Sequence, residues 1–198
     1  LMSYLNKFEI ETSYGIKAWK RWGNTAEQII KSNPYVLCIQ GVDLSFSRAD
    51  AVAAKSDIPA DSECRIKAGI TYILRQNADQ GHTCLPLDSL VKTAVSYLDV
   101  DDKLIKKVIE DETEEENLYY YDKHGRRFVM LADFYKAEDY IARRLAIMRQ
   151  ISYDNKIDFS EVIDLEEENN GIQYEKIQRE AINLALSKGF LVLTGGPG

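Results

Sequence analysis

The sequence has no long apolar run and no segment resembling a secretory leader. No stretch approaches the roughly 18 uncharged apolar residues that a membrane-spanning helix needs, and residues 1–4 begin no basic region followed by an apolar one. We therefore expect no association with a membrane, and the cytoplasm is the predicted compartment. Internal repeats of solenoid length are also absent from the sequence.

Cysteine and histidine are too few and too scattered for a disulfide framework or a metal site. Cys38, Cys64 and Cys84 include no CxxC pair, and no histidine lies at zinc-finger spacing from them. Free, buried thiols are therefore expected, and no metal ligands. His82 is accompanied by no serine or cysteine nucleophile pattern, so a turn or packing role is predicted for it and no catalytic residue is assigned.

The composition is that of a folded chain with an acidic balance. Its 198 residues are 45% hydrophobic, enough to bury one good core or two small ones. The formal net charge of -7 argues mildly against a nonspecific nucleic-acid coat, because phosphate binding draws on clustered lysine and arginine. Acidic residues gather at 114–116 and 166–168, and basic residues at 17–21 and 143–144. Local phosphate contacts and plain solvated faces both remain open.

The first 55 residues predict short helices separated by glycine turns, with no strand-like alternation. Helical patterning covers residues 24–31, and residues 47–55 continue as an alanine-rich helix. Between them, Asn33 and Pro34 open another helix as its capping residue and its first helical residue. The fold class is therefore predicted to be mainly α.

Three amphipathic helices are predicted after Pro59. The first follows Ser62 as a capping residue and stops at Gly81, and the second covers residues 90–98. Asp101 or Asp102 caps the third. The sequence thus predicts a set of three helices.

A β-hairpin is predicted directly after the third helix. Segments 118–121 and 128–131 are rich in β-forming residues, and turn-forming residues occupy 122–125 between them. Three helices followed by a hairpin predict a winged-helix-like unit over residues 59–135. Arg126 and Arg127 would then reach phosphate from the wing, with pairing to the nearby acidic run as the alternative.

The C-terminal third predicts two further helices and a strand. A long amphipathic helix is indicated by apolar residues between 137 and 148, followed by a polar linker or exposed turn up to Gly171. From Tyr174 a last helix runs to Gly189, and the apolar run 190–194 suits a buried parallel strand.

The strand is followed by Gly195-Gly196-Pro197-Gly198, the opening of a phosphate-binding loop. Such loops need glycine because their backbone N–H groups fold around phosphate oxygens, which a Cβ would obstruct. The pattern G-x-x-x-x-G-K-[ST] is incomplete here, without its lysine and hydroxyl. Taken alone, this tetrapeptide is more often a turn or a tag remnant.

Gln178 lies one helix upstream of the predicted strand. Its amide can both donate and accept, which matches the adjacent donor and acceptor on the edge of adenine. An exposed helical glutamine is the simpler interpretation of this residue by itself. Helix, strand and glycine loop together favour a nucleotide-dependent motor.

These residues resemble the RecD-like superfamily 1 helicases, which include the exodeoxyribonuclease V alpha subunit and its stand-alone bacterial relatives. The segments that carry the resemblance are Gln178-Arg179-Glu180-Ala181, similar to the Q motif; Val192 to Gly198, similar to the start of motif I; and, upstream, Asn33-Pro34-Tyr35, Arg48-Ala49-Asp50, Gly81-His82-Thr83 and Leu85-Pro86. The upstream motifs occur in the order of the helix-hairpin-helix region that precedes the motor in the stand-alone relatives.

The resemblance implies a domain order and an activity. It implies a helix-hairpin-helix-like region over 1–58, the winged-helix-like unit over 59–135, a connecting helix and linker over 136–171, and the first helix and strand of a truncated α/β motor over 172–198. ATP hydrolysis coupled to DNA strand separation, in recombination or repair, is the implied activity of the full-length enzyme, with ATP and Mg²⁺ as cofactors. Without the lysine, the hydroxyl and an acidic residue, this stretch is expected to be inactive alone and to hold no cofactor.

Site residues follow from the same resemblance and from the basic segments. Gly195, Gly196, Pro197 and Gly198 would cradle phosphate, and Gln178 would contact adenine. The candidates for DNA contact are Gly15, Lys17, Lys20, Arg21, Arg48, Arg126 and Arg127. Single-stranded or forked DNA is the implied partner, with other subunits of a helicase–nuclease complex as further candidates.

One departure concerns the hairpin of the N-terminal region. The family typically has a glycine–hydrophobic–glycine hairpin, but Asp43 and Ser45 stand here where glycines are expected. Because Asp43 repels phosphate, residues 14–21 are the better phosphate candidate, with a charged surface helix as their alternative.

Two other functions remain open. A non-catalytic module that docks a protein or DNA and positions the motor fits the acidic balance. Another ATPase class, such as a recombination or clamp-loading motor, would also fit the glycine loop.

Overall fold

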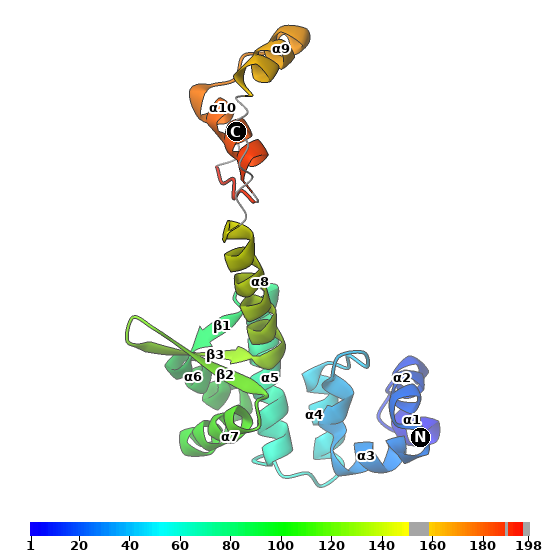
Figure 1. Ribbon diagram of the computed structural model, residues 1–198. Coiled ribbons are helices and arrows are strands. Elements are labelled where there is room, and N and C mark those ends of the chain that lie inside the picture. The colour runs from blue at the N-terminus through cyan, green and yellow to red at the C-terminus, as the bar shows by residue number, and fades with distance from the viewer. Residues whose placement is uncertain (151–158, 189, 196–198) are drawn as a thin grey trace. The chain divides into compact units, whose positions relative to one another are not determined.

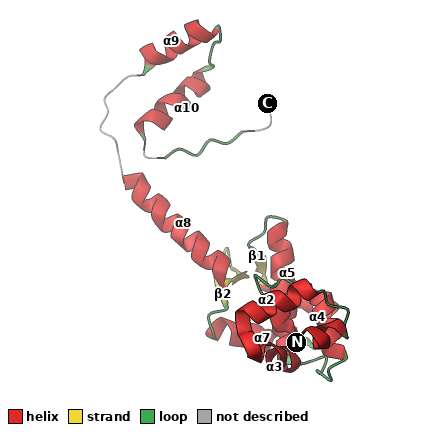
Figure 2. Ribbon diagram, turned by 90° about the vertical axis from the view of Figure 1, so that its right-hand side faces the viewer, coloured by secondary structure: helices red, strands yellow, loops and turns green. Residues whose placement is uncertain are grey.

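The computed structural model describes residues 1–150, 159–188 and 190–195, and the chain divides into two compact units, Leu1–Tyr135 and Lys136–Gly198. The first unit contains a helical region and a winged helix, and most of the helices of the chain belong to it (Figure 2). No helix among the described residues is long and apolar enough to cross a membrane.

The N-terminal region consists of short helices, as predicted. They are α1 (Met2–Asn6), α2 (Thr12–Trp22), η1 (Gly23–Thr25), α3 (Ala26–Ser32), η2 (Pro34–Cys38) and α4 (Phe46–Ala54), with η marking a 3₁₀ helix. Asn33 caps η2, since its side chain accepts a hydrogen bond from the Tyr35 backbone N–H at 3.0 Å. Leu5, Ile30 and Leu37 are each at most 1% exposed, so this region has a genuine core.

The second part of the first unit has the element order of a winged helix (Figure 1). Its elements are α5 (Glu63–Asp79), β1 (Cys84–Pro86), α6 (Leu87–Leu98), α7 (Asp102–Glu114), β2 (Leu118–Lys123) and β3 (Arg126–Leu131). Strand β3 lies between β1 and β2 and is antiparallel to both. The predicted three helices and hairpin are confirmed, and β1 is an addition that closes the sheet against them.

Hairpin register and helix ends refine the sequence-based boundaries. Tyr120 pairs with Val129, and the strands close on a two-residue turn at His124 and Gly125, both with positive φ. Asp101 caps α7 through its carboxylate, as one of the two predicted alternatives. Ser62 precedes α5 but makes no side-chain capping bond; its hydroxyl instead lies 3.5 Å from the Cys64 thiol.

Helix α5 is shared by both parts of the first unit. It contacts η2 and α4 of the N-terminal region, and also α6, α7, β1 and β3 (Figure 1). The glycine at position 69 permits the close approach of α6, because a Cβ there would lie 2.6 Å from Leu98 Cδ2. Ile66 and Ile70 are at most 1% exposed, so α5 is the central helix of the core.

The C-terminal elements differ from two predictions. The long helix is confirmed as α8 (Ala132–Gln150), which starts in the first unit, and the last helix as α10 (Lys176–Ser187). The polar stretch predicted as a linker instead contains a helix, α9 (Ser160–Asn170), because Ile163 is buried to 4% exposure and Gly171 ends the helix in the left-handed region. Arg179 of α10 pairs with Asp164 and Glu167 of α9, and the two helices lie side by side (Figure 2).

The strand predicted for residues 190–194 is not formed. The structure describes this run as irregular, with Val192 and Leu193 69% and 77% exposed. A parallel strand is held by its neighbours in a sheet, and the described part of the second unit has no strand to pair with it. The predicted helix end at Gly189, and Gly196 to Gly198 of the predicted loop, lie outside the described residues.

Candidate nucleic-acid interface

The loop between η2 and α4 is a tight turn held by side chains. Gly41 and Asp43 have φ of +95° and +64°, the left-handed region that favours glycine. The Asp43 carboxylate accepts a hydrogen bond from the Gly41 N–H at 3.0 Å. The positive φ at position 43 explains why glycine is expected there. Aspartate adopts the same left-handed conformation with the help of its hydrogen bond to the Gly41 N–H.

Lys17 is exposed, but its ammonium group contacts this loop. Its Nζ donates to the Val42 carbonyl at 3.1 Å and lies 3.7 Å from the Asp43 carboxylate. The ammonium group therefore ties α2 to the turn and offsets the charge of Asp43. Exposed pairs of this kind contribute little free energy, but they fix where the charge lies.

Gly15, next in the candidate set, has a packing role in the structure. It is buried in α2, and a Cβ at that position would lie 2.5 Å from Met2 Sδ. Arg48 contacts the loop before α2: it donates to the Glu9 carbonyl at 2.6 Å and to the Glu11 carboxylate at 3.3 Å. Both residues therefore have a structural role in holding α2 in place, although the Arg48 side chain is still 37% exposed.

Lys20 and Arg21 are exposed and make no ion pair with any residue that the structure describes. They lie in the last turn of α2, and Arg21 sits 5.9 Å from the ring centroid of Trp22. Trp19 is 55% exposed on the same helix. Proteins that bind single-stranded nucleic acids combine cations, which contact phosphates, with exposed aromatic rings, on which bases stack.

The two wing arginines have different surroundings. Arg127 pairs with Asp122 on the neighbouring strand at 3.0 Å and lies over the Tyr120 ring, 4.8 Å from its centroid. It thus pairs within the hairpin, not with the acidic run 114–116. Arg126 is exposed and makes no ion pair with any residue that the structure describes.

The joint between the two parts of the first unit is a polar network that sequence reasoning missed. Arg65 of α5 donates to both carboxylate oxygens of Asp50 in α4, at 2.7 and 3.2 Å, and Tyr35 of η2 donates its hydroxyl to the same carboxylate. Arg65 also donates to the carbonyls of Ala60 and Leu98 at 2.7 and 2.8 Å. The network therefore connects η2, α4, α5 and the end of α6.

Electrostatics at this joint favour the ion pair. Burial opposes ionisation of Asp50, but the hydrogen bonds from Arg65 and Tyr35 outweigh it and hold the pKa of the carboxyl below its usual range. Burial, followed by the bond to Asp50, raises the pKa of the Tyr35 phenol. In the sequence, the Ala49-Asp50 pair pointed to this region, but the residues that bind the Asp50 carboxylate lie 15 positions away on either side.

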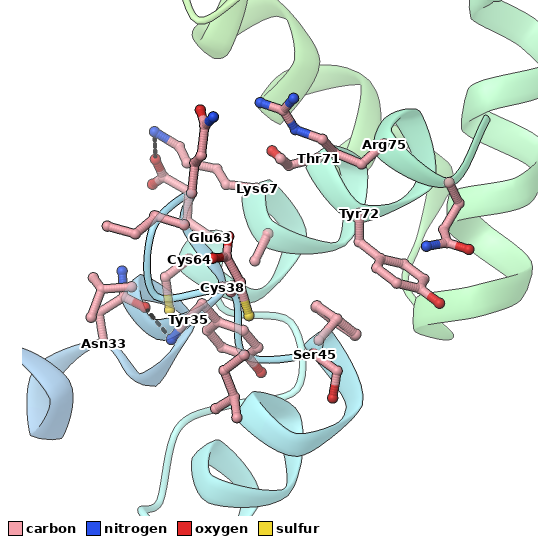
Figure 3. Close-up of a pocket in the computed structure, with 18 of the residues that line it drawn as sticks. Asn33, Tyr35, Cys38, Ser45, Glu63, Cys64, Lys67, Thr71, Tyr72 and Arg75 are labelled. Carbon is pink, nitrogen blue, oxygen red and sulfur yellow. Dashed lines mark hydrogen bonds and ion pairs between the residues drawn. The ribbon is translucent and has the colours of Figure 1, made fainter. Parts of the chain in front are cut away.

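A groove of about 1050 Å³ runs beside this joint, between η2, the following loop and α5 (Figure 3). Cys38 and Cys64 line it with Tyr35 and Tyr72, and burial raises the pKa of the Cys38 thiol to about 12. Cys38, Cys64 and Cys84 are half-buried and form no disulfide with one another. Aromatic rings extend the wall, since Phe46 lies 5.6 to 5.7 Å from three tyrosine rings.

Lys67, in the groove wall, forms ion pairs with three carboxylates. Its Nζ lies 2.9 Å from Glu63, 2.7 Å from Glu112 and 3.3 Å from Glu115. These bonds, that to Glu112 foremost, raise the pKa of the ammonium group. Lys67 therefore fixes α7 to α5 and leaves no free charge for an anion. Among the described residues no cluster of metal-ligating side chains occurs.

The motor candidates lie in the second unit. Gln178 forms a capping box at the start of α10: its amide oxygen accepts from the Glu175 N–H at 2.9 Å, and the Glu175 side chain accepts in return. Gly195 is exposed, with open space where a Cβ would stand. Gly196, Pro197 and Gly198 lie outside the described residues, so the structure does not bring Gln178 together with a complete loop.

Residues 1–84 match the family model of the ATP-dependent RecD2 DNA helicase HHH domain. The matched stretch contains the tied loop, the Tyr35–Asp50–Arg65 network and all of α5, and it ends at the first residue of β1. It identifies an HHH region of the RecD2 helicase type at the N-terminus of this chain. The remaining elements of the winged helix, from α6 onward, and α8, α9 and α10 follow the matched residues.

Proposed function

We propose that this chain is the DNA-handling front part of an ATP-dependent, RecD2-type DNA helicase that acts on single-stranded or forked DNA in recombination or repair. The observation that carries the proposal is the match of residues 1–84 to the HHH domain of such helicases. The left-handed turn at Gly41 and Asp43 supports it, since a glycine-type turn brings backbone N–H groups close to a phosphate.

The proposal extends to a nucleotide site at the start of the motor. The resemblance places the opening of the phosphate loop at Gly195, after α10 and its Gln178. Two observations are compatible with that role: Gly195 has the open surroundings that a phosphate cradle needs, and the Gln178 side chain is held at a helix N-terminus. ATP with Mg²⁺ would supply the energy for strand separation, and a cytoplasmic location accompanies this function.

Salt-dependent binding of the 198-residue chain to single-stranded and forked oligonucleotides, followed by fluorescence anisotropy, tests the DNA-handling role. Replacing Lys20 and Arg21 by alanine should weaken binding to every sequence alike and lower the slope of log affinity against log salt by about 1.4 on single strands, about 0.7 per phosphate contact. Alanine at Lys103 and Lys107 of α7 removes the same charge elsewhere and should change the slope little.

Absence of any salt-dependent binding to either DNA would refute the proposal. The turn offers a second measurement: glycine at Asp43 and Ser45 removes one negative charge and two side chains, so affinity should rise if the turn faces DNA. Lys17 stays unchanged in both variants because it holds the turn.

A docking module that positions the motor, or that joins the other subunits of a complex of the exodeoxyribonuclease V kind, is the second candidate. The observation in its favour is that Lys17, Arg48 and Arg127, three of the candidate DNA contacts, are already used in contacts within the chain, which has a net charge of -7. Such a module would show no retention on DNA at any salt concentration.

A further inference from the structure

The register of the wing separates its side chains into two faces. Leu118, Tyr120 and Asp122 of β2 share the core-side face, where Val129 of β3 is fully buried. The opposite, outer face carries alternate residues of both strands. Its members, named the outer wing face below, are Tyr119, Tyr121, Lys123, Arg126, Phe128 and Met130.

The base of the outer wing face is covered, and its tip is bare. Tyr135, in the first turns of α8, stacks on Tyr119 with ring centroids 4.1 Å apart and an interplanar angle of 4°. Met130 beside it is only 4% exposed. Towards the turn, Tyr121 is 46% exposed and lies 6.4 Å from the half-buried ring of Phe128. An aromatic surface thus continues past the covered part into solvent.

Two cations stand beyond these rings without a counter-charge. Lys123 and Arg126 are directly opposite each other in the ladder, and both are exposed. Like charges at directly opposite positions destabilise a hairpin. The hairpin's acidic residue, Asp122, lies on the other face with Arg127, and neither Lys123 nor Arg126 has an ion-pair partner within the part of the chain that the structure describes. The outer wing face therefore carries two positive charges beside its exposed rings, and these charges would attract an anion.

The neighbouring helix argues against a duplex in the usual winged-helix orientation. In helix-turn-helix proteins the last helix enters the major groove of DNA. Here the first half of α7 carries lysines at 103, 106 and 107, of which Lys106 pairs with Asp102, but its second half contains Glu110, Asp111 and Glu114, and residues 115–116 continue the acidic run. Carboxylates of this number would face the phosphates on both sides of a groove. The wing is basic and aromatic, whereas α7 is acidic over its C-terminal half.

We propose that the outer wing face binds single-stranded DNA, with a base stacked on Tyr121 and Phe128 and the adjoining phosphate held between Lys123 and Arg126. Aromatic rings suit this ligand because every unpaired base offers a flat face, and a cation pair suits its backbone. The inference rests on the proposed DNA-handling function and assigns the strand contact to the wing rather than to α7.

Two wing variants of the 198-residue chain test the assignment, with a labelled oligonucleotide of mixed sequence as the probe. Tyr121→Thr keeps a strand-forming residue but removes the ring, and it should weaken single-strand binding about 5- to 100-fold. Tyr121→Phe keeps the ring and should remain within about 2-fold of the parent. Lys123→Ser with Arg126→Ser should lower the salt slope by about 0.7, the value for the one phosphate that the pair holds.

Controls separate this inference from the broader function. Lys103→Ser with Lys107→Ser removes the same charge from α7, and Arg127→Ser removes a wing cation from the other face; both should bind like the parent. If the chain binds single strands but Tyr121→Thr matches Tyr121→Phe, the wing assignment is wrong while the DNA-handling function stands. If the α7 pair weakens binding more than the wing pair, or if duplex binds more tightly than single strands, the contact lies on α7. No binding by the parent chain overturns the broader function and this assignment with it.

Discussion

Replacing Asp50 by asparagine removes the carboxylate at which η2, α4 and α5 meet. The change leaves the Arg65 guanidinium, whose side chain is 14% exposed, without its counter-charge. Breaking a fully buried pair in this way costs about 3–5 kcal/mol. Since the Asp50 side chain is 29% exposed and asparagine still accepts one hydrogen bond, we expect a loss of about 2–3 kcal/mol.

The chain carries a convenient probe for this measurement. Its two tryptophans, Trp19 and Trp22, are both in α2, so urea unfolding followed by tryptophan fluorescence reports the first unit alone. At a slope of about 2 kcal/mol per molar urea, the midpoint should fall by about 1–1.5 M. Asp122→Asn breaks an exposed pair in the same unit, 52% and 64% exposed, and should cost no more than about 1 kcal/mol.

A double-mutant cycle separates the network from general effects of the substitution. Tyr35→Phe should cost about 1.5–3 kcal/mol, because it removes one hydrogen bond to a charged acceptor. The combined Tyr35→Phe and Asp50→Asn variant should lose less than the sum, because both changes weaken or remove the same Tyr35–Asp50 interaction. A midpoint for Asp50→Asn no lower than that for Asp122→Asn would refute the conclusion that this joint holds the unit together.

Three further outcomes follow from the same contacts. The pKa of Asp50 is held below its unfolded value of about 3.9, so this carboxylate stabilises the fold fully above that pH. The stabilisation is lost as pH falls through the folded pKa. Unfolding curves of the parent and Asp50→Asn should therefore begin to converge below about pH 4. Alanine at Gly69 should destabilise the unit by about 1–3 kcal/mol through its approach to Leu98, and Leu98→Val should recover part of the loss in thermal unfolding. Burial raises the pKa of Cys38 to about 12, so alkylation of this thiol at pH 8 should be slow in the native chain and fast in urea. Mass spectrometry measures both rates, and rapid labelling of the native chain would contradict the shielded position of the thiol.

Local periodicity predicted most of the first unit. Helices with a strong apolar stripe, such as α5 and α6, and the hairpin around its short turn were evident, because each depends on residues close together in sequence. Strand β1 was missed, since Cys84–Pro86 is three residues long and is defined only by pairing with β3. The same limit applies to the joint, where Tyr35, Asp50 and Arg65 come from three elements.

The C-terminal errors have a common physical origin. A glutamate-rich stretch looks like a solvated turn, and α9 became visible only through the burial of Ile163 and the pairing of Arg179 with Glu167. The run 190–194 has the composition of a buried strand, but a strand of that kind needs a sheet around it. Among the site residues, the sequence identified the cations but did not show which of them form contacts within the chain, as Lys17 and Arg48 do.

The position of α5 governs the order in which this unit can assemble during synthesis. As the ribosome releases the chain from its N-terminus, α1 to α4 emerge first but still lack the helix that covers η2 and α4. When α5 emerges, its remaining face, with Ile70 and Ile73, stays uncovered until α6, α7 and β3 have followed. A chain ending at residue 84 would therefore present an apolar helix face to solvent, and we expect it to aggregate, whereas one ending at 135 should unfold as a single cooperative unit.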